Sequence, residues 1–79
     1  MNRPRATEVT ALENYKILLT FNNGEKRIFD VTPYLESKYF EPLKKEGYFR
    51  AVRTNDMSVE WPGNIDICPD ELYYDSIPV

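Results

Sequence analysis

The residues Trp-Pro-Gly-Asn-Ile-Asp-Ile-Cys-Pro-Asp-Glu-Leu-Tyr, at positions 61–73, constrain the architecture more than any other part of the chain. They include the only tryptophan and the only cysteine of the protein. Because proline, glycine and asparagine favour special backbone angles, residues 62–64 predict a tight turn. Ile65 to Ile67 then predict a short strand. Pro69 predicts the start of a helical turn, whose acidic residues suit the positive end of its dipole.

Upstream of this segment, the first half of the chain predicts a strand and then a hairpin. The strand begins at Ala6, and alternating apolar residues continue the pattern after a turn near Asn14. A three-residue loop over residues 22–24 places Ile17 opposite Phe29, which puts the large apolar groups on one face. The same loop places Gly24 at the left-handed position that a type I turn with a bulge requires.

The second half predicts another hairpin, formed by residues 48–54 and 57–61 around Asn55-Asp56. A two-residue loop there pairs Val52 with Val59 and Arg50 with Trp61, and the latter pair suggests a cation–π contact. Two helical turns are predicted between the hairpins. One begins with Thr32 as N-cap and Pro33, and the other covers Pro42 to Glu46 and stops at Gly47. Three apolar residues are expected to cover one face of the sheet: Phe40, Leu43 and Phe49.

These elements predict an α+β fold. It consists of a small antiparallel sheet of two hairpins plus a short C-terminal strand, packed with one or two short helical turns. Residues 6–79 are expected to form a single domain after a disordered N-terminus at residues 1–5. The chain has 79 residues, so a single domain is the natural size.

Composition narrows the class of protein. The net charge is −3, which argues against direct nucleic-acid binding. No apolar run is long enough for a signal peptide or a membrane span, so we expect a cytoplasmic protein with no membrane contact. The single cysteine excludes an intramolecular disulfide, and Cys68, between Ile67 and Pro69, is expected to be a buried, inert thiol.

The residue inventory offers little for catalysis. There is no histidine, which removes the commonest general base and the commonest metal ligand. We therefore assign no catalytic residue, cofactor or metal ligand and expect a protein that is not an enzyme. One alternative is an acidic-site enzyme or a divalent-metal-binding protein, because carboxylates held together can bind a hard cation. Its candidate residues are Asp30, Asp66, Asp70 and Glu71.

Other side chains suit a protein partner. The six tyrosines are many for this length, and tyrosine is enriched in interfaces. Trp61 has two interpretations, a core residue or an exposed interface residue, and the core is favoured. The interaction candidates are Trp61, Asp66, Asp70, Glu71, Tyr73 and Tyr74. A second alternative is a DNA-contacting accessory domain that uses the basic residues Lys26, Arg27, Lys44, Lys45, Arg50 and Arg53.

Three segments carry a resemblance to a known family. They are residues 19–35, with Leu-Thr-Phe-Asn-Asn-Gly-Glu leading into Phe-Asp-Val-Thr-Pro-Tyr-Leu; residues 40–52, with Phe-Glu-Pro-Leu-Lys-Lys before Tyr-Phe-Arg-Ala-Val; and residues 61–73. Together they resemble the domain of unknown function 2442 family of small bacterial proteins. The resemblance runs from about Ala6 to Tyr74. Members commonly read Trp-Pro-Asn-Gly, whereas this chain has Gly63 before Asn64.

The resemblance implies a compact α+β domain with no established activity. Some members are fused to a DNA-binding helix-turn-helix, and some are encoded beside another small protein in a toxin–antitoxin-like arrangement. It therefore implies a protein-interaction module, with a regulatory or antitoxin-like role towards another small bacterial protein. The expected partner is a protein, either the same chain or a small protein encoded nearby.

Overall fold

A computed structural model describes residues 3–55 and 57–79 of the chain. The strands are β1 (Ala6–Ala11), β2 (Lys16–Phe21), β3 (Lys26–Asp30), β4 (Arg53–Thr54), β5 (Val59–Trp61), β6 (Ile65–Asp66) and β7 (Ile77–Pro78). The α-helices are α1 (Glu46–Phe49) and α2 (Pro69–Tyr74). The 3-10 helices are η1 (Glu13–Tyr15), η2 (Thr32–Glu36) and η3 (Lys38–Lys44).

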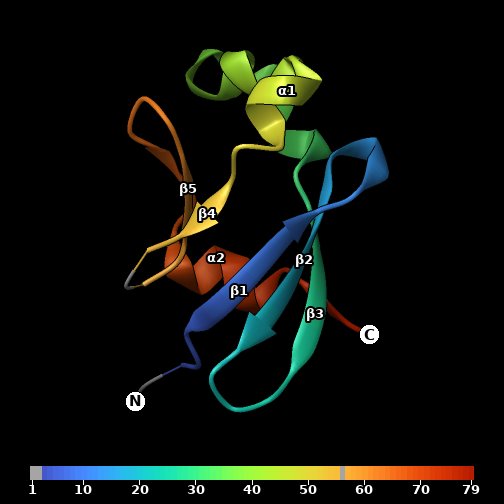
Figure 1. Ribbon diagram of the computed structural model, residues 1–79, viewed down its shortest axis with the longest axis vertical. Helices are drawn as coiled ribbons and strands as arrows, with labels where there is room; N and C mark the ends of the chain where they lie inside the picture. The colour runs from blue at the N-terminus through green and yellow to red at the C-terminus, as the bar shows by residue number, and fades with distance from the viewer. Residues whose placement is uncertain (1–2, 56) are drawn as a thin grey trace.

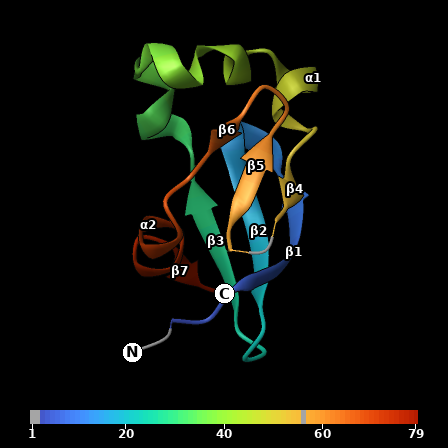
Figure 2. The same ribbon diagram turned by 90° about the vertical axis from the view of Figure 1, so that its left-hand side faces the viewer.

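The strands form two antiparallel sheets. One has four strands in the order β1-β2-β3-β7, and the other has three in the order β4-β5-β6. Helix α2 and the three-stranded sheet lie on the same side of β2 and β3, while η3 and α1 close one end of the molecule (Figures 1 and 2). The predicted α+β class is confirmed. The strands divide into two sheets, however, and β7 joins the edge of the first.

The first hairpin has the register that its loop predicts. Ile17 lies opposite Phe29 in the pairing of β2 with β3. Gly24 has φ +90°, so it occupies the left-handed position. A bulge in β1 at Thr7 lets both Ala6 and Val9 turn towards the core, although they are three positions apart and would lie on opposite faces of a regular strand.

The predicted register of the second hairpin is wrong. Strand β4 pairs Thr54 with Val59 and Arg53 with Glu60, so the register is shifted by two residues. The side chain of Asn55 causes this, because its Oδ1 accepts hydrogen bonds from the Met57 and Ser58 N–H groups and so sets a longer loop. The predicted turn at Asn55-Asp56 includes Asp56, which lies outside the described residues.

The helical turns are present, but their boundaries differ from those predicted. Thr32 is the first residue of η2 rather than its N-cap, and the carboxylate of Asp30 accepts a hydrogen bond from the Thr32 N–H at 2.9 Å. Gly47 does not stop a helix, because it lies inside α1. Tyr48 and Phe49, predicted to begin a strand, also belong to α1.

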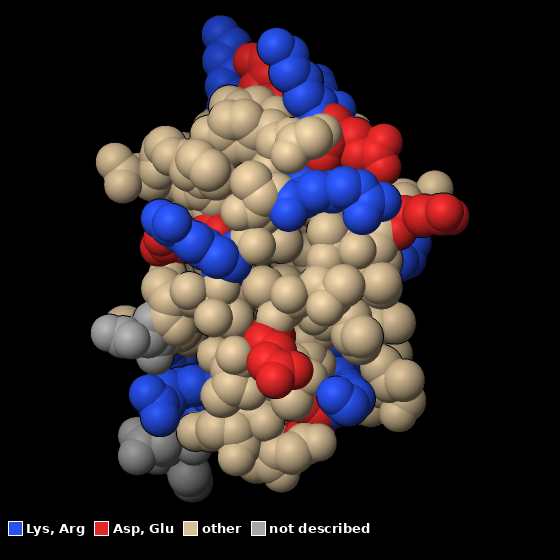
Figure 3. Space-filling model, viewed as in Figure 1, with Lys and Arg blue, Asp and Glu red and all other residues tan. Residues whose placement is uncertain are grey.

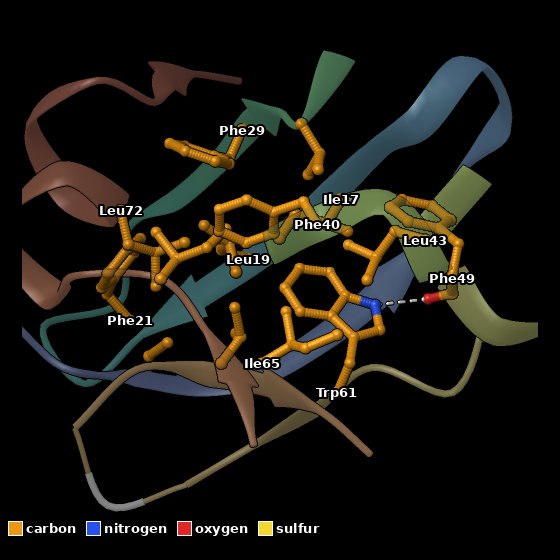
Figure 4. Close-up of a cluster of buried hydrophobic side chains, with 14 residues drawn as sticks. Ile17, Leu19, Phe21, Phe29, Phe40, Leu43, Phe49, Trp61, Ile65 and Leu72 are labelled. Atoms are coloured by element: carbon orange, nitrogen blue, oxygen red, sulfur yellow. Dashed lines mark hydrogen bonds between the residues drawn. The ribbon is translucent and has the colours of Figure 1, made fainter. Parts of the chain in front are cut away.

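The core lies between the two sheets and α2. Figure 4 shows side chains from both sheets and from the helical segments pointing towards one another. Phe40, Leu43 and Phe49 are buried, as predicted. The buried apolar residues are Ala6, Ile17, Leu19, Phe21, Phe29, Val31, Phe40, Leu43, Phe49, Val59, Trp61, Ile65, Ile67 and Leu72.

Candidate protein-interaction surface

Trp61 belongs to the core, as the favoured interpretation predicted. Its side chain is 1% exposed and stacks on Phe49 with ring centroids 6.1 Å apart. The indole Nε1 donates a hydrogen bond of 2.8 Å to the carbonyl of Phe49, so its one polar atom is satisfied (Figure 4). A residue buried in this way is not available to contact a partner.

The acidic candidates lie apart, each with a different neighbour. Asp66 accepts a hydrogen bond from the hydroxyl of Tyr39, whose oxygen in turn accepts the Asp66 N–H. Asp70 forms an exposed ion pair with Arg3, and Glu71 accepts a hydrogen bond of 2.6 Å from the hydroxyl of Tyr34.

Asp30, the fourth acidic candidate, is tied to its own turn. Burial acts to raise its pKa, but the hydrogen bonds from Thr32 and the charge of Lys16 outweigh that effect and hold the pKa below its usual range. Over residues 3–55 and 57–79, no group of three or more Cys, Asp or Glu side chains is arranged to hold a metal ion. The four carboxylates therefore do not form the acidic site that the sequence suggested.

Tyr73 takes part in a polar cluster that fastens α2 to the first hairpin. Its hydroxyl donates to Glu25 at 2.6 Å, and the guanidinium of Arg27 lies 4.6 Å from the centre of its ring. Arg27 also donates to Glu25 and to both the hydroxyl and the carbonyl oxygens of Ser76. We call Glu25, Arg27, Tyr73 and Ser76 the arginine clamp.

The clamp shifts the pKa values of its own members. The hydrogen bond from Tyr73, with those from Asn23 and Arg27, lowers the pKa of Glu25. The same bond to Glu25 raises the pKa of Tyr73. Both shifts indicate that the ionised carboxylate and the neutral phenol are the forms the folded chain favours. The clamp is a structural contact between the first hairpin and the C-terminal segment rather than an open site.

Two C-terminal residues are more accessible. Tyr74 is 64% exposed at the end of α2, next to Tyr73. Cys68 is exposed, so the prediction of a buried thiol is wrong. Its neighbour Ile67 takes the inward position instead, at 1% exposure.

The basic residues do not gather into one patch. Arg27, Arg50 and Arg53 pair with Glu25, Glu46 and Glu60, respectively. On the face drawn in Figure 3, blue side chains collect at the end formed by η3 and α1, where red ones lie among them. Interspersed charges of this kind give a phosphate backbone no continuous positive surface.

The four-stranded sheet carries an apolar surface that the sequence analysis did not select. Directly opposed residues of an antiparallel sheet point to the same face. One face carries Ile17, Leu19 and Phe29 and packs in the core, whereas the alternate residues Leu18 and Ile28 do not contribute to it. Ile77 lies opposite Ile28, and Val79 donates its N–H to the carbonyl of Lys26. Both residues therefore lie along the edge of β3 and enlarge this face of the sheet.

We call this surface the outer sheet face. Its middle row runs Thr10, Leu18, Ile28, Ile77 across the four strands. Charged residues flank that row, Lys16 and Asp30 at one end of the strands and Glu8 and Lys26 at the other. The elements that pack against the sheet lie on its opposite, inner side (Figures 1 and 2). Ile77 and Val79 are 69% and 78% exposed.

A sequence signal for part of this surface exists. With Ile17, Leu19 and Phe21 on the buried face, position 18 belongs to the side that is normally polar, and it holds leucine. The register of the first hairpin places Ile28 beside it. No such signal marks Ile77, because the pairing of β7 with β3 joins residues about fifty positions apart.

A model of one protein family, described as a protein of unknown function (DUF2442), matches residues 6–78 of the chain. The chain belongs to this family. No curated protein and no solved structure matches the chain. Among the described residues, no helix is both long and apolar enough to cross a membrane.

The DUF2442 match includes β1 to β7 and therefore the strands that build the outer sheet face. It also includes the turn at Gly63 and Asn64. Gly63 and Asn64 have φ values of +87° and +66°, so both residues adopt the left-handed region. Glycine and asparagine tolerate that region best, so both residues suit the backbone of this turn.

Proposed function

We propose that this DUF2442 chain is a non-enzymatic protein-interaction module that acts as a regulatory or antitoxin-like partner of another small bacterial protein. The observation that carries the proposal is the outer sheet face. Leu18, Ile28, Ile77 and Val79 carry apolar side chains on the face of the sheet that does not contribute to the core. Exposed apolar patches bounded by polar residues are typical of protein-binding sites.

The charges around the apolar patch indicate the surface chemistry of the partner. The outer sheet face carries Lys16 and Lys26 as well as Glu8 and Asp30, so neither sign dominates. A matching surface is flat and apolar in the middle, with charges of both signs at its rim. That chemistry fits a folded protein better than a phosphate backbone or an anionic membrane, both of which select a surplus of basic residues.

The non-enzymatic part of the proposal has its own support. The chain has no histidine. The carboxylates considered for acid–base or metal chemistry each engage a separate neighbour: Thr32 for Asp30, Tyr39 for Asp66, Arg3 for Asp70 and Tyr34 for Glu71. Acid–base pairs, by contrast, work through carboxylates that face one another across a shared site.

Co-expression of the chain with the product of the adjacent gene tests the proposal. We expect the two proteins to co-purify as a stoichiometric complex, and we expect Leu18→Glu to abolish the complex, because a buried unpaired carboxylate opposes an apolar interface. Met57→Glu is the matched control, since Met57 is an exposed apolar residue (58%) in the loop between β4 and β5. A chain that binds neither that product nor itself would overturn the proposal.

A further inference from the structure

The residues of the outer sheet face are arranged so that the surface fits a copy of itself. Thr10, Leu18, Ile28 and Ile77 form a straight row across the strands. On one side of this row β3 carries Asp30, and on the other side it carries Lys26. The two charges are therefore placed on opposite sides of an apolar line, at similar distances from it.

We propose that the outer sheet face pairs with the same face of a second copy of this chain, forming a two-fold symmetric dimer. This inference rests on one part of the proposed function, the assignment of the outer sheet face as a protein-binding surface, and it names a second copy of the chain as the occupant of that face. A two-fold interface is self-complementary, because each residue meets its counterpart under the same rotation. Residues on the two-fold axis meet their own counterparts, so they must be apolar. Residues on either side of the axis meet the residues of the opposite side, so these two sides must carry opposite charges.

The middle row fulfils the first condition. A two-fold axis that runs along this row, between the two facing sheets, places Leu18 over Leu18 and Ile28 over Ile28 of the second copy. Ile77 meets Ile77 in the same way, while Thr10 lies at the far end of the row. Two sheets pack about 10 Å apart, with their strands within about 30° of each other, so the apolar side chains of both rows meet along the axis.

The flanking charges fulfil the second condition. The same rotation exchanges the two ends of each strand, so Asp30 of one copy faces Lys26 of the other, and the reverse pair forms as well. Lys16 faces Thr20 in this arrangement, and no residue of the described outer sheet face meets a like charge. Lys26 already points over the face, because its Nζ donates to the hydroxyl of Thr20 at 3.1 Å.

The size of the surface sets the strength of the dimer. The four strands have 6, 6, 5 and 2 residues. With strands about 4.8 Å apart and about 3.4 Å per residue, the sheet covers only roughly 300 Å². Stable interfaces bury about 800 Å² on each partner, so we expect a reversible dimer that dissociates on dilution. An obligate dimer is not expected from this area.

Sedimentation equilibrium over a wide concentration range tests the inference. We expect the wild-type average mass to rise from monomer to dimer across roughly 1–500 µM, the range typical of a small interface. Leu18→Glu brings two carboxylates together at the axis, so we expect it to weaken self-association at least about 10-fold. Met57→Glu, at an exposed apolar site elsewhere, should leave the mass curve unchanged.

A charge exchange tests the proposed axis. Asp30→Lys places lysine opposite Lys26, and Lys26→Glu places glutamate opposite Asp30, so each single variant should weaken the dimer. The double variant restores opposite charges in the reversed order, and we expect it to recover most of the wild-type association. Circular dichroism of all three variants confirms that the monomer fold is retained, which matters because Asp30 also accepts the Thr32 N–H.

The results separate this inference from the proposed function. A wild-type chain that remains monomeric at every concentration overturns self-pairing, and so does a Leu18→Glu variant that associates as strongly as wild type. If that monomeric chain still binds the product of the adjacent gene and loses it on Leu18→Glu, the proposed function stands, and that product rather than a second copy occupies the outer sheet face. A dimer that survives Leu18→Glu but not a change elsewhere assigns the interface to another surface.

Discussion

The two faces of the four-stranded sheet are built from the same strands and from similar apolar residues, but only the inner face packs in the core. On the inner face, Ile17, Leu19, Phe21 and Phe29 are each 2% exposed or less, because the second sheet and α2 pack over them. On the outer face, Leu18 and Ile28 remain half-buried beside the exposed Ile77. Burying such a side chain fully contributes about 1.5–3 kcal/mol. The inner face therefore stabilises the fold, whereas Leu18 and Ile28 would gain further burial only against a partner.

The largest expected effect separates neighbouring leucines on these two faces. Leu19→Ala removes a side chain with 0% exposure, so we expect a loss of about 2–5 kcal/mol in the free energy of unfolding. Leu18→Ala, one residue earlier, should cost about 1 kcal/mol or less. Urea denaturation of both variants at low protein concentration measures the difference. Equal losses would contradict the assignment of Leu18 to a binding surface.

A smaller effect is expected in the turn that closes the second sheet over the inner face. Gly63 has φ +87°, and an added Cβ would lie 2.8 Å from the hydroxyl oxygen of Tyr48, which bonds the carbonyl of Pro62. We expect Gly63→Ala to cost about 2–3 kcal/mol from backbone strain and the disturbed hydrogen bond.

The matched control for that turn lies in the first hairpin. Gly24 has a similar φ of +90°, but an added Cβ meets nothing within 4 Å. Gly24→Ala should therefore cost only the backbone strain, about 1–2 kcal/mol. Thermal denaturation of both variants compares them directly. A larger loss for Gly24→Ala would contradict the expected clash between a Cβ at position 63 and the hydroxyl of Tyr48.

The smallest effect concerns the arginine clamp, which holds α2 against the inner side of the sheet. The folded chain lowers the pKa of Glu25 below its ordinary value of 4.5. The stability that the carboxylate contributes is therefore complete above that value and is lost as the pH falls through the lower, folded pKa. We expect Glu25→Gln to be less stable than wild type at pH 7, with the difference shrinking in acid.

Urea midpoints measured from neutral pH down to strongly acidic pH test this expectation. Tyr73→Phe removes the largest cause of the lowered pKa, the hydrogen bond from the Tyr73 hydroxyl, and should reduce the same pH dependence in part. A constant difference between wild type and Glu25→Gln across the whole range would show that the clamp does not depend on the charge of Glu25.

The inner face is the part of the fold that the sequence predicts well. The length of the loop at residues 22–24 and the alternation of Ile17, Leu19 and Phe21 set the register of the first hairpin, because a shift of one residue would expose all three. Trp61 in the core, the turn after it and the helix at Pro69 follow from residue types with few alternatives.

The parts that were mispredicted depend on contacts between distant residues or on side-chain hydrogen bonds. The second hairpin takes its register from the Asn55 side chain, which no alternation reveals. Strand β7 forms only because β3 offers a free edge, and Pro78 argues locally against a strand. The candidate site was predicted at the acidic C-terminal segment, whereas the apolar surface arises from four strands that only the fold brings together.

The difference between the two faces can be tested most directly by measuring the mass and the stability of a single variant, Leu18→Glu. We expect this variant to unfold cooperatively with a midpoint close to that of wild type, yet to remain a monomer at concentrations where wild type forms dimers. Loss of the folded state on this substitution would contradict our account, because it would place Leu18 in the core. Undiminished dimer formation would contradict it equally.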